Sequence, residues 1–192
     1  TGGSTLKEIK NALKFFYKNK NVALLKCTVN YPANLNELNL NTIKDLKKKF
    51  KNMQIGYSDH TIGDIASITA VSLGASIIEK HFTLSKKIES IDNFFSSDPE
   101  ELKLLIKKSK QVILSSGTTF YGPTISETKS IKYRRSIYVS KLINKGEKIT
   151  RQNIKLVRPA KSLNPKFYYK ILGKISRKKL SVGSRISLSY FN

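Results

Sequence analysis

The chain has 192 residues, 39% of them hydrophobic, and a formal net charge of +23 at pH 7. This length allows one domain or a large and a small one, and no stretch approaches the roughly 20 apolar residues of a membrane helix. Most of the positive charge comes from scattered lysines, while arginine, the usual bidentate reader of phosphates and bases, is scarce, so we expect neither a nucleic-acid nor a membrane partner.

The first part of the chain alternates helical and strand patterns. Ser4 is expected to cap a helix whose apolar stripe runs from Leu6 to Phe16. Strands are then expected at 22–28, 54–58 and 76–82, and helices at 39–50, 61–73 and from 99 to about 114. Asp98 is the expected N-cap of the last helix, with Pro99 in its first position. This order predicts a parallel α/β sheet, and because three strands cannot close a barrel, we expect the later part of a larger (β/α) domain.

The composition changes after residue 115, and we predict three parts: a domain at 1–115, a linker at 116–132 and a small β-rich domain at 133–192. In the last part we expect a strand at 134–142, a helix at 151–154 capped by Thr150, an extended stretch at 155–159, a helix at 167–172 and a strand at 185–188. The single cysteine, Cys27, is interpreted as core packing and fits a reducing compartment such as the cytoplasm.

Both histidines of the chain, His60 and His81, stand at the ends of successive apolar runs. Parallel α/β sheets carry their chemistry at the carboxyl ends of strands. With Asp59 and Glu79 beside them, two imidazoles there favour a metal site that is open to substrate. On spacing alone, ordinary core or surface histidines remain an alternative.

Three motifs carry a family resemblance: LLKCTVNYP at 24–32, GYSDHTIG at 56–63 and GASIIEKHFTL at 74–84. They resemble the NeuB-like sialic acid synthase family, and its pseudaminic acid branch in particular. The resemblance continues through RRSIYVS at 134–140 and VRPAKSLNPKFYYKILGK at 157–174, and so covers essentially the whole chain. It implies the C-terminal portion of a (β/α)8 TIM barrel, followed by a small β-rich SAF domain of the β-clip, antifreeze-like type.

The resemblance also implies an activity. The family condenses phosphoenolpyruvate with an N-acetylated amino sugar and water, here of the 6-deoxy-AltdiNAc type, to give pseudaminic acid and phosphate. A divalent metal (Mn²⁺, Mg²⁺ or Co²⁺) is implied between His60 and His81, with Glu79 as a third catalytic residue. N-acetylneuraminate or legionaminate synthesis, and a non-catalytic carbohydrate- or polyanion-binding role, remain alternatives.

Four more residues match substrate-binding positions of the family. Ser58 matches a serine that binds phosphoenolpyruvate, and Tyr31 falls at an active-site tyrosine. Asp92 matches a carboxylate that holds sugar hydroxyls. Arg158 matches a SAF arginine that reaches the active site of a partner subunit, which implies a domain-swapped homodimer.

The chain departs from the family pattern in three respects. Val29 stands where the family has Asn or Ser in contact with phosphoenolpyruvate, and Asn30 is not expected to replace that residue. Ser90 and Ile91 stand in place of the usual Gly-Pro before the sugar-binding carboxylate. The family's first four or so strands, which carry its phosphate-binding lysines, have no counterpart here, so we expect these 192 residues alone to be inactive.

Overall fold

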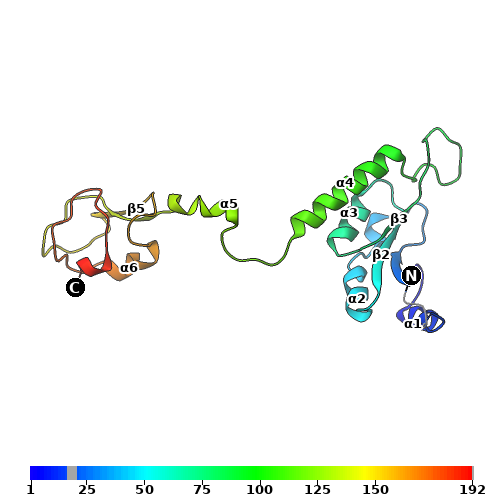
Figure 1. The fold of residues 1–192 in the computed structure, drawn as a ribbon, viewed down its shortest axis with the longest axis horizontal. Helices are drawn as coiled ribbons and strands as arrows, with labels where there is room; N and C mark the ends of the chain where they lie inside the picture. Colours follow the sequence, from blue (N-terminus) through cyan, green and yellow to red (C-terminus); the bar gives the residue numbers. More distant parts are fainter. Residues whose placement is uncertain (17–20, 192) are drawn as a thin grey trace. The chain divides into compact units, whose positions relative to one another are not determined.

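The computed structural model describes residues 1–16 and 21–191, which form two compact units, Thr1–Thr118 and Thr119–Asn192. The first unit contains α1 (Leu6–Lys14), β1 (Ala23–Cys27), the 3₁₀ turn η1 (Leu35–Glu37), α2 (Thr42–Lys49), β2 (Gln54–Asp59), α3 (Ile65–Ser72), β3 (Ile78–Lys80) and α4 (Pro99–Ser116) (Figure 1). The second contains α5 (Ile125–Thr128), η2 (Ile131–Tyr133), β4 (Ser136–Val139), β5 (Ile154–Val157), η3 (Pro165–Phe167), α6 (Tyr168–Ile171) and η4 (Leu188–Tyr190).

The first unit is built on a parallel sheet with the strand order β1-β2-β3, as the alternating pattern predicts. Its register aligns Cys27 with Ser58, and Ser58 with Glu79. Residues aligned across a sheet share a face, so these three side chains project to the same side. Helices α2 and α3 cover the opposite face.

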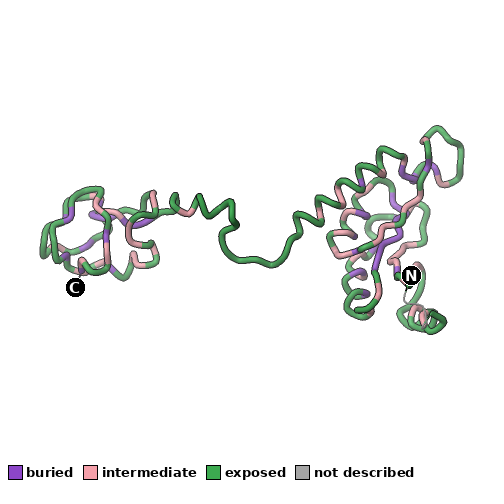
Figure 2. The backbone as a smooth tube through the Cα atoms, in the orientation of Figure 1, coloured by how far each residue is buried: buried purple, intermediate pink, exposed green. Residues whose placement is uncertain are grey.

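Buried residues occur along the strands and helices of the first unit (Figure 2). Their apolar side chains form one core. Its most deeply buried members are Ile43, Leu46, Ile55, Tyr57, Ala66 and Ala70. Gly56 lies on the same face of the sheet as Ser58 and has close neighbours there. A Cβ at this position would stand 2.4 Å from Leu25 Cδ2 and 2.6 Å from the carbonyl oxygen of Ile77. Glycine therefore lets the three strands pack tightly below the strand ends.

The helix starts follow capping chemistry. The N-cap of α1 is Thr5 and not Ser4, because Thr5 accepts from the Glu8 backbone while the Glu8 carboxylate accepts from Thr5 N at 2.7 Å. The Thr5 hydroxyl and the Thr5 amide both donate to the Glu8 carboxylate, and these two hydrogen bonds lower its pKa. The prediction of Asp98 at the start of α4 is confirmed, and Glu101 completes its capping box.

Two elements of the first unit are shorter than their patterns predict. Helix α3 begins at Ile65 rather than at residue 61, because the amide of Thr61 is hydrogen-bonded by Asp59 in a turn. Strand β3 covers three residues, and the chain beyond it forms one parallel bridge between Phe82 and Ser97.

In the second unit β4 and β5 pair antiparallel and lie against a separate apolar core. The helix expected at 151–154 is wrong: Asn153 Oδ1 accepts from Thr150 N at 2.8 Å and closes a turn, and Ile154 opens β5 with its side chain buried. The helix expected at 167–172 is confirmed as α6. The predicted strand at 185–188 is reduced to one bridge, between Tyr138 and Arg185.

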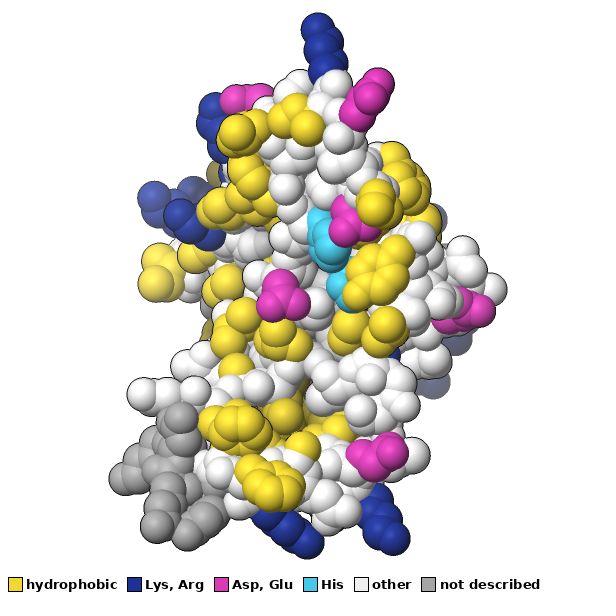
Figure 3. Space-filling view, turned by 90° about the vertical axis from the view of Figure 1, so that its right-hand side faces the viewer, with side chains coloured by type: hydrophobic (Ala, Val, Ile, Leu, Met, Phe, Trp, Pro, Cys, Tyr) yellow, Lys and Arg dark blue, Asp and Glu magenta, His cyan; other side chains and the backbone are white. Residues whose placement is uncertain are grey.

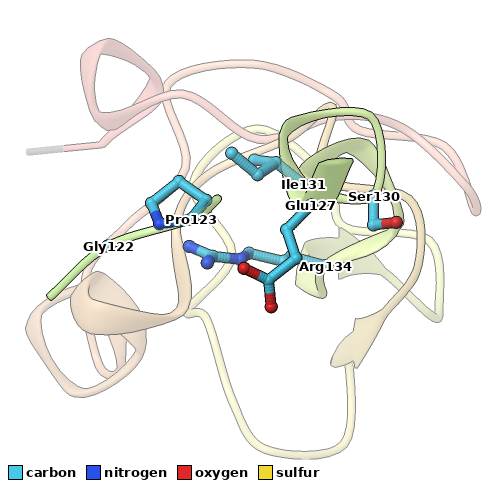
Figure 4. A pocket seen from close by; sticks show the side chains of 6 residues that line it. All are labelled: Gly122, Pro123, Glu127, Ser130, Ile131 and Arg134. Atoms are coloured by element: carbon cyan, nitrogen blue, oxygen red, sulfur yellow. The ribbon is translucent and has the colours of Figure 1, made fainter. Parts of the chain in front are cut away.

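The stretch expected to be a linker, residues 116–132, contains regular structure. Helix α4 runs to Ser116, and Thr124 caps the short helix α5 through a capping box with Glu127. A shallow pocket there is lined by Gly122, Pro123, Glu127, Ser130, Ile131 and Arg134 (Figure 4). The Glu127 carboxylate is already engaged by the backbone and hydroxyl of Thr124, which lowers its pKa. Among the described residues, no helix has the length and apolarity to span a membrane.

Candidate functional site

The two histidines meet at the carboxyl edge of the sheet. Asp59 of β2 is aligned with Lys80 of β3, so the residues that follow them, His60 and His81, stand side by side. Their ring centroids are 5.3 Å apart and the rings are nearly perpendicular, at 81°. Figure 3 shows both rings on one face of the first unit, between acidic and apolar side chains. The parallel register thus brings together two imidazoles that are 21 positions apart in the chain.

His60 is held by the end of β1. Its Nδ1 lies 2.9 Å from the carbonyl oxygen of Thr28 and 3.8 Å from Cys27 Sγ. A carbonyl oxygen only accepts hydrogen bonds, so Nδ1 carries the proton and Nε2 keeps its lone pair. The ring is 6% exposed, so few other orientations are open to it.

His81 is held by the loop that follows β3. Its Nδ1 lies 3.4 Å from Asp92 Oδ2, and its ring packs against Phe95 with centroids 4.8 Å apart. A carboxylate facing Nδ1 favours the proton on that nitrogen and again leaves Nε2 with the lone pair. Both Nδ1 contacts therefore favour the tautomer that a metal-ligating imidazole requires.

Tyr31 forms one wall of the site. Its ring lies 4.2 Å from the ring of His60 at an interplanar angle of 30°, and 5.8 Å from that of His81. The side chain is 53% exposed, so one face of the ring stays open to a bound molecule. This placement agrees with an active-site tyrosine, although packing alone would give the same contacts.

Ser58 and Glu79 are register partners that lie two residues before His60 and His81, and their side chains form a hydrogen-bonded pair. The Ser58 hydroxyl donates to Glu79 Oε1 at 2.6 Å. A serine has a single proton to donate, so an anion bound to Ser58 would compete with Glu79 for it. The pair joins a hydroxyl and a carboxylate on the same sheet face as the histidines.

The sequence places Asp59 beside the two histidines, but its side chain lies on the opposite face of the sheet. Successive strand residues point to opposite faces, and the Asp59 side chain lies in the helix-covered face, fully buried against Lys80 and Ser67. It is therefore not a ligand for a metal between His60 and His81.

The donor set fits a divalent metal held by two protein nitrogens. Among the described residues neither Nε2 atom has a hydrogen-bond partner, while Nδ1 of His60 lies 2.9 Å from the Thr28 carbonyl oxygen and Nδ1 of His81 lies 3.4 Å from a carboxylate oxygen of Asp92, the kinds of neighbour that orient metal-ligating histidines. Among the residues that the structure describes, no three His, Cys, Asp or Glu side chains cluster as a metal site. Two imidazoles leave several coordination positions for water and substrate oxygens, as a catalytic site requires.

The structure shows how exposed the residues are at which the chain departs from the family pattern, and which contacts they make. Val29 is 54% exposed. Asn30 lies in the loop beyond β1 and its amide donates to Glu37 at 3.3 Å, so its side chain is used elsewhere. Ile91 is 92% exposed, next to Asp92. Arg158 is exposed just after β5 in the second unit, whose placement against the first is not determined.

Sequence reasoning missed two residues of the site. Phe95, 2% exposed, packs against His81 and Tyr31, and its apolar loop gave no periodic signal. Lys80 is buried behind the histidines, and a lysine inside the apolar run ASIIEKHF is the signal that could have found it.

Comparison with protein families and with known proteins identifies relatives of this chain. A family model described as NeuB family matches residues 1–121, and one described as SAF domain matches residues 134–189. Pseudaminic acid synthase of Campylobacter jejuni is 39% identical over 193 residues, which cover 100% of this chain and 56% of that protein. N,N'-diacetyllegionaminic acid synthase of the same species is 42% identical over 183 residues, covering 93% of this chain and 54% of that protein.

A solved structure is also similar. The N-acetylneuraminic acid synthetase of Leptospira borgpetersenii, crystallised with citrate, is 37% identical and superposes with a TM-score of 0.62, covering 68% of this chain and 46% of that one. The chain thus spans about half the length of the curated relatives it matches.

Proposed function

The chain belongs to the NeuB family and carries a SAF domain, and on that basis we propose that its full-length gene product condenses phosphoenolpyruvate with an N-acetylated amino sugar to form pseudaminic acid. The observation that carries this proposal is the His60–His81 pair at adjacent strand ends, each ring presenting Nε2. The LLKCTVNYPA and LNPKFYYKILGK stretches support the pseudaminic branch.

In the proposed reaction, C3 of phosphoenolpyruvate attacks the aldehyde carbon of the open-chain sugar and forms a C–C bond. The aldehyde oxygen becomes a hydroxyl by taking up a proton. Water adds at C2, the C–O bond to phosphate breaks, and phosphate leaves behind a 2-keto acid. No oxidant or reductant is needed, so binding, orientation and proton placement are the protein's tasks.

His60 and His81 would hold the divalent metal (Mn²⁺, Mg²⁺ or Co²⁺), which supplies Lewis acidity towards a carbonyl oxygen when bound. Thr28 and Asp92 fix the proton positions of the two rings. The buried wall of Phe95 limits water on one side of His81.

Ser58 and Glu79 are proposed to act on phosphoenolpyruvate and water. The Ser58 hydroxyl donates to Glu79, and it would turn towards a substrate oxygen when the anion binds. Glu79 would then be left with a free carboxylate oxygen to hold or move a proton of the attacking water. This exchange couples substrate binding to the availability of the base.

The sugar side of the site is proposed to include Tyr31 and Asp92. Tyr31 offers an exposed ring face next to His60, on which the apolar face of a sugar can lie. Asp92 is half-buried and keeps one carboxylate oxygen away from His81, so it can accept from a sugar hydroxyl while orienting the ring.

Arg158 is proposed to reach the site of a partner subunit in a domain-swapped homodimer. Its exposed guanidinium offers planar donors for a carbonyl oxygen such as that of an acylamino group. We place the enzyme in the cytoplasm, because an unpaired Cys27 fits a reducing compartment.

Legionaminate synthesis is the second candidate, since that relative is 42% identical over a comparable share of the chain. Full-length gene product, incubated with phosphoenolpyruvate and each amino sugar in turn, should release phosphate and a nine-carbon keto acid, read by mass spectrometry, fastest with the 6-deoxy-diacetamido sugar. His60→Ala is the matched control. Faster turnover of another amino sugar would replace the pseudaminic assignment, and glycan or polyanion binding without phosphate release would overturn the synthase itself.

A further inference from the structure

We propose that the buried ion pair between Asp59 and Lys80 is a positioning clamp that sets the separation of His60 and His81 and thereby the affinity for the divalent ion. The proposal rests on the proposed metal-dependent function. It concerns two residues that do not touch the substrate and that lie on the opposite face of the sheet.

The clamp joins the two strands at their last register pair. Lys80 Nζ lies 3.1 Å from Asp59 Oδ2, and Asp59 is the register partner of Lys80. One residue further along each strand come His60 and His81. A change in the separation of the paired residues is therefore passed directly to the two imidazoles.

The clamp also holds His60 from its other side. Lys80 Nζ donates to the carbonyl oxygen of Thr61 at 2.7 Å, while Asp59 Oδ1 accepts from the amide of Thr61 at 2.8 Å. His60 thus lies between two residues that are both tied to the ion pair. Ser67 of α3 donates to Asp59 Oδ2 at 2.6 Å and fixes the carboxylate against the helix layer.

Burial makes this arrangement rigid. The Asp59 side chain is 0% exposed and that of Lys80 3% exposed, so neither charge is screened by water. The hydroxyl of Thr61 is buried without a hydrogen-bond partner among the described residues, so the turn is held in a conformation that its own side chain does not favour.

Stability alone does not account for such a pair. Taking two charges out of water costs free energy that their attraction often fails to recover, and neutral side chains of similar volume are frequently as stable. The specific gain is in direction: besides the four polar contacts described, the Tyr57 hydroxyl donates to Asp59 Oδ1 at 3.4 Å, and these five contacts together fix both strand ends. A pair of neutral side chains would fill the space without fixing it.

The test uses full-length gene product and measures Mn²⁺ binding by electron paramagnetic resonance, together with the thermal melt. Variants are Asp59→Asn, Lys80→Met, the double variant, and Lys80→Arg as the conservative rescue. Lys108→Met is the matched control, since Lys108 of α4 makes a comparable ion pair at 2.6 Å with Asp64, the N-cap of α3.

We expect Lys80→Met and Asp59→Asn to raise the Mn²⁺ dissociation constant about tenfold or more. The double variant should recover the melting temperature, because no lone buried charge remains, yet keep the weakened Mn²⁺ binding. Lys80→Arg should recover part of the affinity, and Lys108→Met should leave it unchanged.

Wild-type Mn²⁺ affinity in a folded double variant would overturn the clamp. Should the charge variants not fold, Ser67→Ala decides: it keeps both charges and releases the carboxylate, so we expect a severalfold weaker affinity, and an unchanged value would overturn the proposal. Failure of wild-type protein to bind Mn²⁺ at all would instead overturn the metal role in the proposed function, so the two failures are distinguishable.

Discussion

His60 and His81 each commit Nδ1 to a neighbour that only accepts hydrogen bonds, a backbone carbonyl for His60 and the Asp92 carboxylate for His81. Both contacts favour a proton on Nδ1, although the rings come from different strands. This shared tautomer leads to the first prediction.

His60→Ala and His81→Ala should each lower activity by orders of magnitude, because a single imidazole is a weak ligand for an open metal site. Exhaustive chelation of wild-type enzyme should do the same, and Mn²⁺, Mg²⁺ or Co²⁺ should restore it. Phosphate release is the measurement, and Cys27→Ser is a useful comparison since Cys27 Sγ lies 3.8 Å from His60 Nδ1 but is not proposed as a ligand. Full activity of a metal-free enzyme would contradict this expectation.

Much of the fold was predictable because its signals are local. The apolar run that became β2 and the Asp98-Pro99 helix start each act within a few residues, and both are confirmed. The α/β portion of a NeuB barrel followed by a SAF domain with a small antiparallel sheet is confirmed as well.

The errors arise where tertiary contacts override local preference. Thr150 precedes a stretch with a helix-start signal, but burying Ile154 in the second core favoured a strand. Asp59 is expected beside the histidines from its position next to His60, but strand alternation places its side chain on the other face of the sheet, with Lys80.

Gly56→Ala should destabilise the protein by about 3 kcal/mol, because the new Cβ would overlap Leu25 Cδ2 and the Ile77 carbonyl. Chemical denaturation of full-length protein is the measurement. Gly183→Ala is the control: its φ of 78° costs backbone strain of about 1 kcal/mol, but no atom lies within 4 Å of the added Cβ. Equal losses in the two variants would show that the strand contact at Gly56 is relaxed easily.

Residues 1–192 produced on their own should bind hydrophobic dyes or aggregate. Within the described residues β1 pairs with β2 alone, and Val29, Ile62 and Phe82 are each about half exposed or more. Residues 119–192, whose described part has its own core of nine buried apolar side chains, should by contrast melt cooperatively without dye binding. A soluble 1–192 chain with one sharp melt and no dye binding would refute the exposed-edge argument.

The last prediction tests whether Arg158 acts across a subunit boundary. Arg158→Ala should raise the KM for the amino sugar or lower kcat, with little change in the KM for phosphoenolpyruvate, because a guanidinium suits the acylamino carbonyl. The segment between Ser116 and Ile125 reaches about 27 Å if fully extended, which is less than an unstructured linker of residues 116–132 would allow. Mixing subunits tests directly whether the second domain of one subunit serves the barrel of its partner.

Subunits carrying Arg158→Ala are mixed with subunits carrying His60→Ala, each of which is impaired by itself. If the arginine serves the partner's barrel, one site of each heterodimer combines an intact His60 with an intact Arg158, and activity should recover towards one site per dimer. If the arginine serves its own barrel, every site lacks one of the two groups and no recovery is expected. Absence of recovery in verified heterodimers, or a fully active monomer, would rule out the domain-swapped arrangement, while Arg158→Lys mixed in the same way shows whether charge alone restores the contact.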